Sequence, residues 1–380
     1  MLWLFALIIS VIHVGMVLWL ASAWRKKSPE NYADETPPLS IIVCARNEAE
    51  NLPRLLACLT NQDYPDYEII IVNDRSEDES AELLAQTVQN DSRIRVITIT
   101  ETPAGWSPKK WAIHQAVRAS KYEYLVLTDA DCTMDQHWLR HMSRPFLAGQ
   151  NLILGVGLYE KENTFLNDFI QYETRQTAFL YTSRALQGRA YMGVGRNLAY
   201  TKSLYHQAGG MEAIKGSLSG DDDLLVKNMT AFAQTAVVTH GESLTWSHPK
   251  RTWHEWYQQK LRHLSAGKRY HRNSLLFLGV YHQSHLLLYL IWLISFCDTE
   301  KNILFWTNFF IFVGLLGAKN IVIQQITRRW EKRSFSPKDV LYGFCFAVYI
   351  AILVPLSVLH RPVWKPTKSN PANAPQKTTD

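Results

Sequence analysis

The sequence predicts an α/β domain with a mainly parallel sheet, flanked by membrane-spanning helices at both ends of the chain. Three observations support this prediction. Long apolar stretches lie near both ends of the 380 residues, whereas the middle is mixed and charged. In that middle, short β-branched runs alternate with helical patterns, which is typical of βαβ units. Hydrophobic residues make up 47% of the chain, enough to bury a large core and to exclude general disorder.

Charge and cysteine content exclude two further classes. Lys and Arg number 40 against 34 Asp and Glu, which gives a net charge of +6. This excess is mild, and no basic run is long enough to predict nucleic acid as a partner. The five cysteines show no CxxC spacing, so they indicate neither a disulfide framework nor a zinc site.

The first apolar stretch is predicted to be a membrane anchor, residues 1–24. Residues 2–23 have about the length that a membrane-spanning helix needs, and the basic segment 24–27 follows them at once. A cleaved signal peptide, the alternative, would carry its positive charge before the apolar run. By the positive-inside rule the C-terminal end of this helix lies in the cytoplasm.

About three more spans are predicted within residues 274–360. Apolar stretches lie near 274–297, 303–324 and 339–359, and the basic segment 328–333 between the last two predicts a cytoplasmic loop. We therefore expect an integral membrane protein whose middle domain is cytoplasmic; if the source is a bacterium, the membrane is the cell or inner membrane. The polar residues 282–285 leave open that part of the first stretch lies along the interface. The tail, residues 361–380, has a composition typical of disorder.

The middle domain is predicted over residues 38–245. Strands are expected at 40–44, 68–73, 94–99, 124–128 and 152–156, and helices are expected after Asn47, Ser76, Lys109 and Asp135. Asn47 and Ser76 are each followed three residues later by Glu, a capping signature that predicts a helix start. Ligands of such sheets bind beyond the carboxyl ends of the strands, which makes the polar residues at three strand ends candidates. They are Arg46, Asn47, Glu48, Asn73, Asp74, Asp129 and Asp131.

Several common motifs are absent from the sequence. It has no GxxxxGK[ST], HExxH or GxSxG, which argues against a P-loop, a zinc protease and a serine hydrolase. Gly155-Val156-Gly157 and Gly193-Val194-Gly195 lack the third glycine of a dinucleotide fingerprint, and we interpret them as turns.

Two acidic groups are candidates for chemistry. Asp129 and Asp131 follow an apolar strand, and paired carboxylates suit Mg²⁺ or Mn²⁺ bridging the phosphates of a nucleotide. A helix N-cap or a solvated turn is the alternative. The second group is Asp221-Asp222-Asp223, where mutual repulsion predicts at least one raised pKa unless a cation or donors lie nearby. Its alternative is an ordinary helix start, where acids favour the positive end of the helix dipole.

Residues 246–272 are predicted to contain an amphipathic interfacial helix. At helical spacing Gln259 and Arg262 fall opposite an apolar stripe, so they would face the middle domain while the stripe lies in the interface. Arg262 would then be available to a phosphate or an acid, although a solvated polar face is the alternative. The stripe consists of Trp253, Trp256, Tyr257, Leu261 and Leu264.

Seven motifs in this order resemble membrane-bound family 2 glycosyltransferases, over roughly residues 38–270. The resemblance implies a GT-A fold, a nucleotide-activated sugar, a divalent metal and inversion at the anomeric carbon. The motifs are Pro38–Glu48, Ile71–Asp74, Lys109-Lys110, Thr128–Asp131, Gly195–Tyr200, Gly220–Asp223 and Gln259-x-x-Arg262.

The resemblance also implies residue roles. Arg46, Glu48 and Asp74 would form the nucleotide pocket, with Asp74 at the base, and Lys109 or Lys110 would be the donor-pocket lysine. Asp129 would contact nucleotide and metal, and Asp131 the metal. The family's Glu-Asp reads Asp-Asp-Asp here; alignment of the trailing Asp-Leu makes Asp221 the catalytic base and Asp222 the second choice. Gln259 and Arg262 match the family's Gln-x-x-Arg-Trp, but His263 replaces the tryptophan, which weakens any inference of a polymer channel.

These features together predict an inverting transferase that uses a nucleotide-sugar and acts on a lipid or lipid-linked acceptor. UDP is favoured only because it is common in the resembling family. A processive polysaccharide synthase and a catalytically inactive membrane scaffold are the alternatives. A transporter is disfavoured because the apolar spans carry few ionisable groups beyond histidines.

Overall fold

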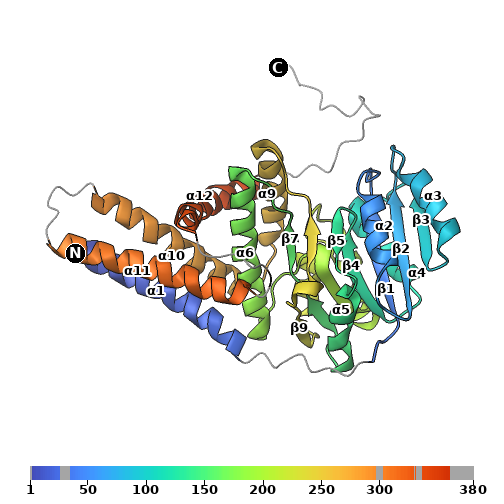
Figure 1. Ribbon diagram of the computed structural model, residues 1–380, viewed down its shortest axis with the longest axis horizontal. Helices are drawn as coiled ribbons and strands as arrows, with labels where there is room; N and C mark the ends of the chain where they lie inside the picture. Colours follow the sequence, from blue (N-terminus) through green and yellow to red (C-terminus); the bar gives the residue numbers. More distant parts are fainter. Residues whose placement is uncertain (1, 26–34, 297–302, 329, 331–335, 360–380) are drawn as a thin grey trace, which may run out of the picture.

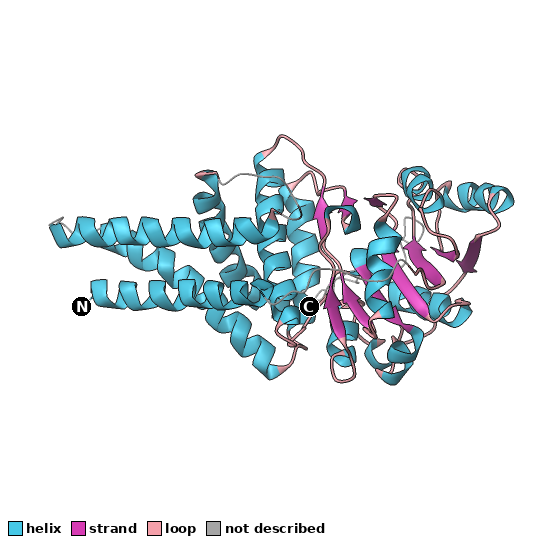
Figure 2. Ribbon diagram, turned by 60° about the horizontal axis from the view of Figure 1, so that its bottom comes forward, coloured by secondary structure: helices cyan, strands magenta, loops and turns pink. Residues whose placement is uncertain are grey.

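A computed structural model describes residues 2–25, 35–296, 303–328, 330 and 336–359. The sheet domain occupies one half of the molecule and long helices extend from the other (Figure 1). All strands gather in the sheet half, and the second view shows the same division (Figure 2). The predicted architecture, a mainly parallel sheet with apolar helices from both ends of the chain, is confirmed.

The main sheet has seven strands in the order β3-β2-β1-β4-β8-β6-β9. Its first four strands are parallel, β8 runs antiparallel to β4 and β6, and β9 is parallel to β6. The five predicted strands are all present, and the central ones read as continuous apolar runs because helices cover both faces. The bounds are β1 (Leu39–Ala45), β2 (Tyr67–Asp74), β3 (Ile94–Ile99), β4 (Tyr124–Asp129), β6 (Leu152–Leu154), β8 (Leu198–Thr201) and β9 (Thr235–Val237).

A small second sheet lies beside the main one and was not expected. Its order is β5-β10-β7, with β10 antiparallel to β5 and parallel to β7. Each strand has only three residues: β5 (Cys132–Met134), β7 (Gly157–Tyr159) and β10 (Thr245–Ser247). Because β5 begins directly after Asp131, this sheet fixes the chain that leaves the predicted metal loop.

The helices that cover the main sheet include the four that were expected, but two of them begin later. Asn47 and Ser76 do not cap them; instead the Asn47 amide donates to Ser76 Oγ at 3.1 Å, and Asn47 Oδ1 accepts from the Glu77 amide at 2.8 Å. The capping interpretation is therefore wrong, and these residues join the loops after β1 and β2. The bounds are α2 (Leu52–Thr60), α3 (Ser80–Asn90), α4 (Pro108–Ala119), α5 (Trp138–Leu147), α7 (Lys202–Gln207) and α8 (Asp223–Met229).

Four helices in the described part of the chain are long and apolar enough to cross a membrane. The polar residues of α10 face the interior of this bundle: His13 Nδ1 lies 3.0 Å from Ser284 Oγ, and Lys319 Nζ lies 2.7 Å from His285 Nε2. This packing accounts for polar residues in an apolar helix without placing the helix along the interface. The helices are α1 (Leu2–Ser22), α10 (Arg272–Phe296), α11 (Ile303–Thr327) and α12 (Lys338–Leu359). The predicted tail, residues 361–380, lies outside the described residues.

A long helix that the sequence did not reveal, α6 (Phe165–Leu186), stands between the bundle and the sheets (Figure 1). It packs on β7 and β9 from one side and on α1, α11 and α12 from the other. The Trp24 indole donates to Ser183 Oγ at 2.8 Å, which ties the end of α1 to α6. Although α6 belongs in sequence to the predicted domain 38–245, it also forms the base of the helical bundle.

The predicted amphipathic helix is α9 (Trp253–Gly267). Its apolar stripe faces protein: Trp256 and Leu261 are buried in a cluster with residues of α6 and α12. The Trp256 ring lies 5.5 Å from Phe169 and 5.3 Å from Tyr349, whereas the Trp253 side chain is 50% exposed. The expectation that the whole stripe lies in the membrane interface is therefore corrected, because most of it holds α9 against the bundle.

Candidate active site

One cavity of about 940 Å³ begins at the carboxyl ends of β1, β2 and β4 and continues between α10 and α12. Its position confirms that the polar strand ends meet at one edge of the sheet. The two described non-glycine residues with positive φ, Asn47 (53°) and Arg75 (51°), lie at this edge. Of the predicted site residues, those that line the cavity are Arg46, Glu48, Asp74, Lys109, Asp129, Asp131, Asp221, Asp222, Gln259 and Arg262.

Arg46 and Glu48 follow β1, and Asp74 ends β2, so all three lie at the carboxyl edge of the sheet. Asp74 is buried and pairs with Arg75, whose Nε lies 2.7 Å from Asp74 Oδ1. Glu48 Oε2 accepts from Asn51 Nδ2 at 2.7 Å, which fixes this carboxylate at the start of α2. Arg46 is buried, and its Nε has no hydrogen-bond partner among the described residues. A buried guanidinium with an unmet donor suits an anionic ligand.

Lys109 connects the two acidic groups. From the first turn of α4 its Nζ lies 2.9 Å from Asp129 Oδ1 and 2.9 Å from Asp221 Oδ2. Burial disfavours its charge, but the two carboxylates outweigh burial and hold the pKa of Lys109 well above its usual value. Lys109 therefore carries a stable positive charge between Asp129, at the end of β4, and Asp221 in the acidic cluster.

Lys110 has a different role from its neighbour. Its side chain is 1% exposed, and Nζ donates to the backbone carbonyls of Ile214, Ser217 and Ser219 at 2.8, 2.6 and 3.0 Å. Lys110 does not line the cavity, and burial lowers its pKa to about 8. Of the two candidate lysines, only Lys109 lines the cavity, whereas Lys110 anchors the loop before the acids.

The three consecutive acids have three different environments. Burial raises the pKa of Asp221, but the charge and hydrogen bond of Lys109, with a contribution from Arg262, leave that pKa below its usual value. Asp222 accepts from the amides of Gly195 at 2.9 Å and of Asp223 at 2.8 Å, and burial and Asp221 raise its pKa. The raised pKa of Asp222 agrees with the repulsion expected within the cluster, and Asp222 is also the N-cap of α8.

Asp223 faces away from Lys109. Its Oδ2 accepts from the Tyr270 hydroxyl at 2.6 Å, while its Oδ1 is buried without a partner in the described part of the chain. Burial, followed by the charge of Asp222, raises the pKa of Asp223 well above its usual value. Asp221 is thus the member of the cluster that stays most readily ionised.

Asp131 has the surroundings that a divalent cation would relieve. Burial, and then the charges of Asp129 and Glu48, raise the pKa of Asp131. No described lysine or arginine forms an ion pair with it, and the Cys132 thiol lies 3.7 Å from its Oδ1. Asp129 at the end of β4 and Asp131, two residues later, lie close enough to repel, and such paired carboxylates offer the oxygen ligands that Mg²⁺ and Mn²⁺ prefer. The residues therefore fit a divalent metal.

Arg196, within the Gly195–Tyr200 motif, also lines the cavity. Nη1 donates to Ser247 Oγ at 3.0 Å, Nη2 donates to Gly157 O at 2.8 Å, and the guanidinium lies 4.2 Å from the centre of the Tyr159 ring. A Cβ on Gly157 would lie 2.3 Å from Arg196 Nε. The Gly155-x-Gly157 pair is therefore needed for close packing, and its interpretation as a simple turn is incomplete.

The polar face of α9 closes the cavity from the bundle side. Gln259, Arg262 and His263 line it, and Gln259 Nε2 lies 3.5 Å from the Tyr159 hydroxyl. Between them Lys260 is buried in an ion pair with Glu173 of α6, which fixes α9 to that helix. The predicted orientation of Gln259 and Arg262 toward the sheet domain agrees with this arrangement.

Comparisons with known proteins agree with the fold. The family model "Glycosyl transferase family 2" matches residues 40–209. A probable glycosyltransferase, YdaM of Bacillus subtilis, is 23% identical over 247 residues, 63% of this chain and 56% of that protein. The poly-β-1,6-N-acetyl-D-glucosamine synthase of Staphylococcus aureus is 30% identical over 110 residues, 29% of this chain and 26% of the synthase. The chain thus matches about half or less of the length of these relatives.

A solved structure extends the likeness to the whole chain. The mannosyltransferase PcManGT of Pyrobaculum calidifontis, in complex with GDP-Man and Mn²⁺, superimposes with a TM-score of 0.59 at 18% identity. The superposition covers 94% of this chain and 99% of that one, so the bundle and the sheet domain share one architecture with it. The domain around the cavity has the GT-A fold, and residues 40–209 of it match the family model of glycosyl transferase family 2.

Proposed function

We propose that the protein is an inverting glycosyltransferase that moves a sugar from a nucleotide-sugar, with a UDP-sugar favoured, to a lipid or lipid-linked acceptor. The observation that carries this proposal is the continuity of the cavity. It joins the strand-end acids to the apolar faces of α10 and α12, both long enough to span a membrane. A water-soluble donor and a lipid acceptor would meet at its middle, beside Asp221.

The donor would occupy the strand-end side. Arg46, Lys109 and Asp74 line this side of the cavity. Arg46 and Lys109 would offer positive charge to the donor's phosphates, and Asp74 would bind its base. Asp129 and Asp131 would hold Mg²⁺ or Mn²⁺, which would offset the charge that builds on the departing diphosphate. The mannosyltransferase with the similar fold contains GDP-Man and Mn²⁺, so a test of donors includes both GDP-sugars and UDP-sugars.

Asp221 would remove the proton from the acceptor hydroxyl. A base must be ionised before it can accept a proton, and Lys109 holds the pKa of Asp221 below its usual value despite burial. Attack by the activated hydroxyl on the face opposite the diphosphate inverts the anomeric carbon. Asp222 is less suited to this role because both of its carboxylate oxygens already accept backbone hydrogen bonds.

The catalytic domain would lie in the cytoplasm. The bundle ends nearest the sheet domain carry basic residues: Arg25 follows α1 and Arg328 follows α11. These two ends lie together, because the rings of Trp24 and Trp330 are 5.9 Å apart. Positive charge at this side favours a cytoplasmic location by the positive-inside rule.

Filling the membrane side of the cavity should impair use of the lipid acceptor. Gly279 lines the cavity on α10, and a Cβ there would meet no atom within 4 Å. Gly279→Leu is therefore expected to fold, with a gain in helix propensity of roughly 1 kcal/mol. It should raise the apparent KM for a lipid acceptor about tenfold, while hydrolysis of the donor stays unchanged.

The matched control is Gly314→Leu on α11, where a Cβ also meets no atom within 4 Å but the cavity is not reached. Initial rates against lipid acceptor and against water separate the two steps. If both leucine variants used the acceptor like the wild type, the acceptor would not lie between α10 and α12.

Arg262 is expected to be essential for transfer. It lines the cavity, and its charge helps to lower the pKa of Asp221. Lysine cannot reproduce a planar, two-pronged contact with phosphate or carboxylate. Arg262→Lys should therefore lose most activity and Arg262→Ala nearly all, with membrane insertion unchanged. Arg272→Ala, at the start of α10 and outside the cavity lining, serves as the control. Transfer by Arg262→Ala at the wild-type rate would show that α9 contributes only packing and that Arg262 takes no part in the reaction.

A processive synthase is the second candidate, favoured by the similarity of part of the chain to a poly-β-1,6-N-acetyl-D-glucosamine synthase. Chromatography of the product separates the two: single addition gives one extended acceptor, and processive synthesis gives a ladder or a long polymer. His263 at the tryptophan position favours single addition.

A further inference from the structure

The wall of the cavity that runs from β10 to α12 is positively charged. None of the described residues that line this wall, from Ser247 to Ser357, is Asp or Glu, because the acids of the lining lie in the strand-end loops, on α6 and in the 221–223 cluster. Lys260 is paired with Glu173 of α6, and the other cations leave the wall with an excess of positive charge. The cations of this cationic wall are Lys250, Lys260, Arg262 and Lys268.

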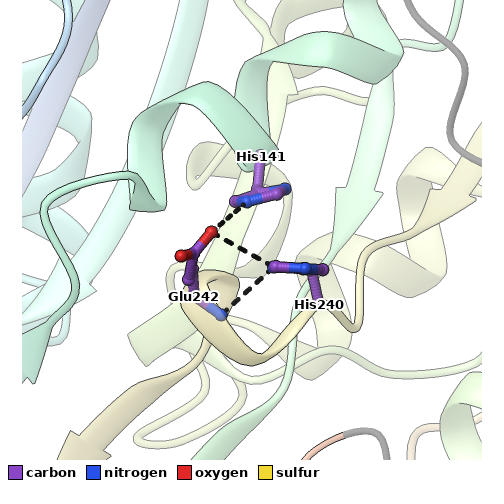
Figure 3. A group of neighbouring side chains, drawn as sticks. All are labelled: His141, His240 and Glu242. Carbon is purple, nitrogen blue, oxygen red and sulfur yellow. Dashed lines mark hydrogen bonds and ion pairs between the residues drawn. The ribbon is translucent and has the colours of Figure 1, made fainter.

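Lys268 is the member of the cationic wall that adjoins the membrane helices. It is the C-cap of α9, and α10 begins four residues later at Arg272. It forms no ion pair with a described residue. Titratable groups outside the cavity can be satisfied by one another, as His141 and His240 are by Glu242 (Figure 3). A basic residue beside the end of a membrane helix is suited to the anionic head group of a lipid.

The C-terminal end of α9 is joined to the loop that precedes the acidic cluster. Ser265 Oγ and Ser219 Oγ are 2.9 Å apart, and both side chains are buried. Lys268 follows Ser265 by three residues, and Asp221 follows Ser219 by two. A head group held at this end of α9 would therefore lie next to the loop that carries Asp221.

His263 indicates how positive this part of the cavity is. Burial, and then the charges of Arg262, Lys260, Arg196 and Lys109, lower the pKa of His263 well below its usual value. Its Nε2 lies 3.4 Å from Arg262 Nη2, a contact in which the neutral ring accepts from the guanidinium. A negatively charged ligand at this point would offset several of these charges at once.

We propose that the cationic wall binds the head group of the acceptor, and that this head group joins a hydroxyl to a negatively charged phosphodiester. The inference rests on the proposed transferase function and adds the chemical class of its acceptor. The phosphodiester would lie between Arg262 and Lys268, where a guanidinium and an ammonium can both donate to its oxygens. The tails would lie between α10 and α12, where Leu275, Leu278 and Ile350 line the cavity.

The hydroxyl is required because Asp221 acts as a base in the proposed reaction. The hydroxyl oxygen bonds to the anomeric carbon, the bond from that carbon to the diphosphate breaks, and the proton passes to Asp221 as the nucleoside diphosphate leaves. A phosphate oxygen is already ionised at neutral pH and would give Asp221 no proton to remove. The phosphodiester therefore holds the acceptor, and the hydroxyl reacts.

The test compares two lipids that share their tails and a free hydroxyl and differ in the phosphodiester. They are dioctanoylglycerol and dioctanoyl-phosphatidylglycerol. Isothermal titration of the full chain in detergent, without donor, should show that the phospholipid binds at least about tenfold more tightly. Inorganic phosphate alone, which lacks the tails, should bind far more weakly than the phospholipid.

The variant Lys268→Gln should weaken binding of the phospholipid about fivefold and leave binding of dioctanoylglycerol unchanged. Its matched control is Arg269→Gln, which removes the same charge from the next residue, also exposed, but outside the cavity lining. Both residues lie at the C-terminal end of α9, so both complement the helix dipole and only the first reaches the cavity. Arg269→Gln should therefore bind the phospholipid like the wild type.

Equal affinity for the two lipids, or an equal loss in Lys268→Gln and Arg269→Gln, would overturn the proposal. It would also be overturned if inorganic phosphate bound as tightly as the phospholipid, or if Lys268→Gln weakened binding of UDP with Mn²⁺ to the same extent, since the wall would then serve a free anion or the donor. These titrations need no turnover, so their failure leaves the proposed transferase function standing. Absence of nucleotide release from every donor would instead remove that function and leave the lipid preference measured.

Discussion

Changing Asp221 to Asn is expected to lower turnover by about 10² or more, while donor affinity stays near the wild-type value. The substitution preserves shape and removes only the ability to accept a proton. Asp221 is suited to that task because Lys109, 2.9 Å away, favours its ionised form inside a buried cluster. Steady-state kinetics with saturating acceptor, together with nucleotide-binding titrations, would measure the two quantities separately.

The companion variant Asp222→Asn tests whether Asp221 or Asp222 is the catalytic base. The two oxygens of Asp222 accept from the Gly195 and Asp223 amides, and Asn keeps only one acceptor. Asp222→Asn should therefore lower the thermal midpoint and affect turnover less than Asp221→Asn does. A dead Asp222→Asn with an unchanged midpoint, beside an active Asp221→Asn, would move the catalytic role by one residue.

Asp131→Ala should abolish both transfer and metal-dependent nucleotide binding while expression stays normal. Burial and the neighbouring acids Asp129 and Glu48 raise the pKa of Asp131, so removing this carboxylate relieves repulsion in the absence of metal. Loss of the Asp131 carboxylate should therefore abolish the reaction and leave the fold intact. Binding of UDP, with and without Mn²⁺, gives a readout that is separate from turnover.

The control for that experiment is Asp66→Ala, an exposed acid that accepts from the Tyr122 hydroxyl outside the cavity. It should leave metal-dependent binding unchanged. Activity that persists in Asp131→Ala, or in wild-type protein without any divalent cation, would remove the metal from the mechanism.

The sequence predicted the elements that have a clear pattern and missed those that do not. The strands of the parallel sheet are continuous apolar runs, and the membrane helices are apolar over twenty residues or more. In contrast, β5, β7 and β10 have three residues each, too few for any periodicity. Helix α6 is buried on nearly all sides, so it lacks the apolar stripe that marks a surface helix.

The candidate site shows the same limit at the level of single residues. Strand-end position was sufficient to select Asp74, Asp129 and Asp131. It could not separate Lys109 from Lys110, because neighbours on a helix point in different directions and only packing decides which one reaches the cavity. The apolar stripe of α9 was misassigned for a related reason: a stripe predicts burial but does not say whether lipid or α12 covers it.

The most direct test of the account is turnover of nucleotide-sugars by purified protein. Wild type and Asp221→Asn would be incubated with Mn²⁺ and a panel of UDP- and GDP-sugars, with diacylglycerol as a lipid acceptor that carries a hydroxyl, and nucleotide release would be measured. The account predicts release from at least one donor, stimulated by a lipid acceptor, with inverted configuration in the product and a loss of about 10² or more in Asp221→Asn. Release by Asp221→Asn at the wild-type rate, or no release by folded wild-type protein from any donor, would contradict it.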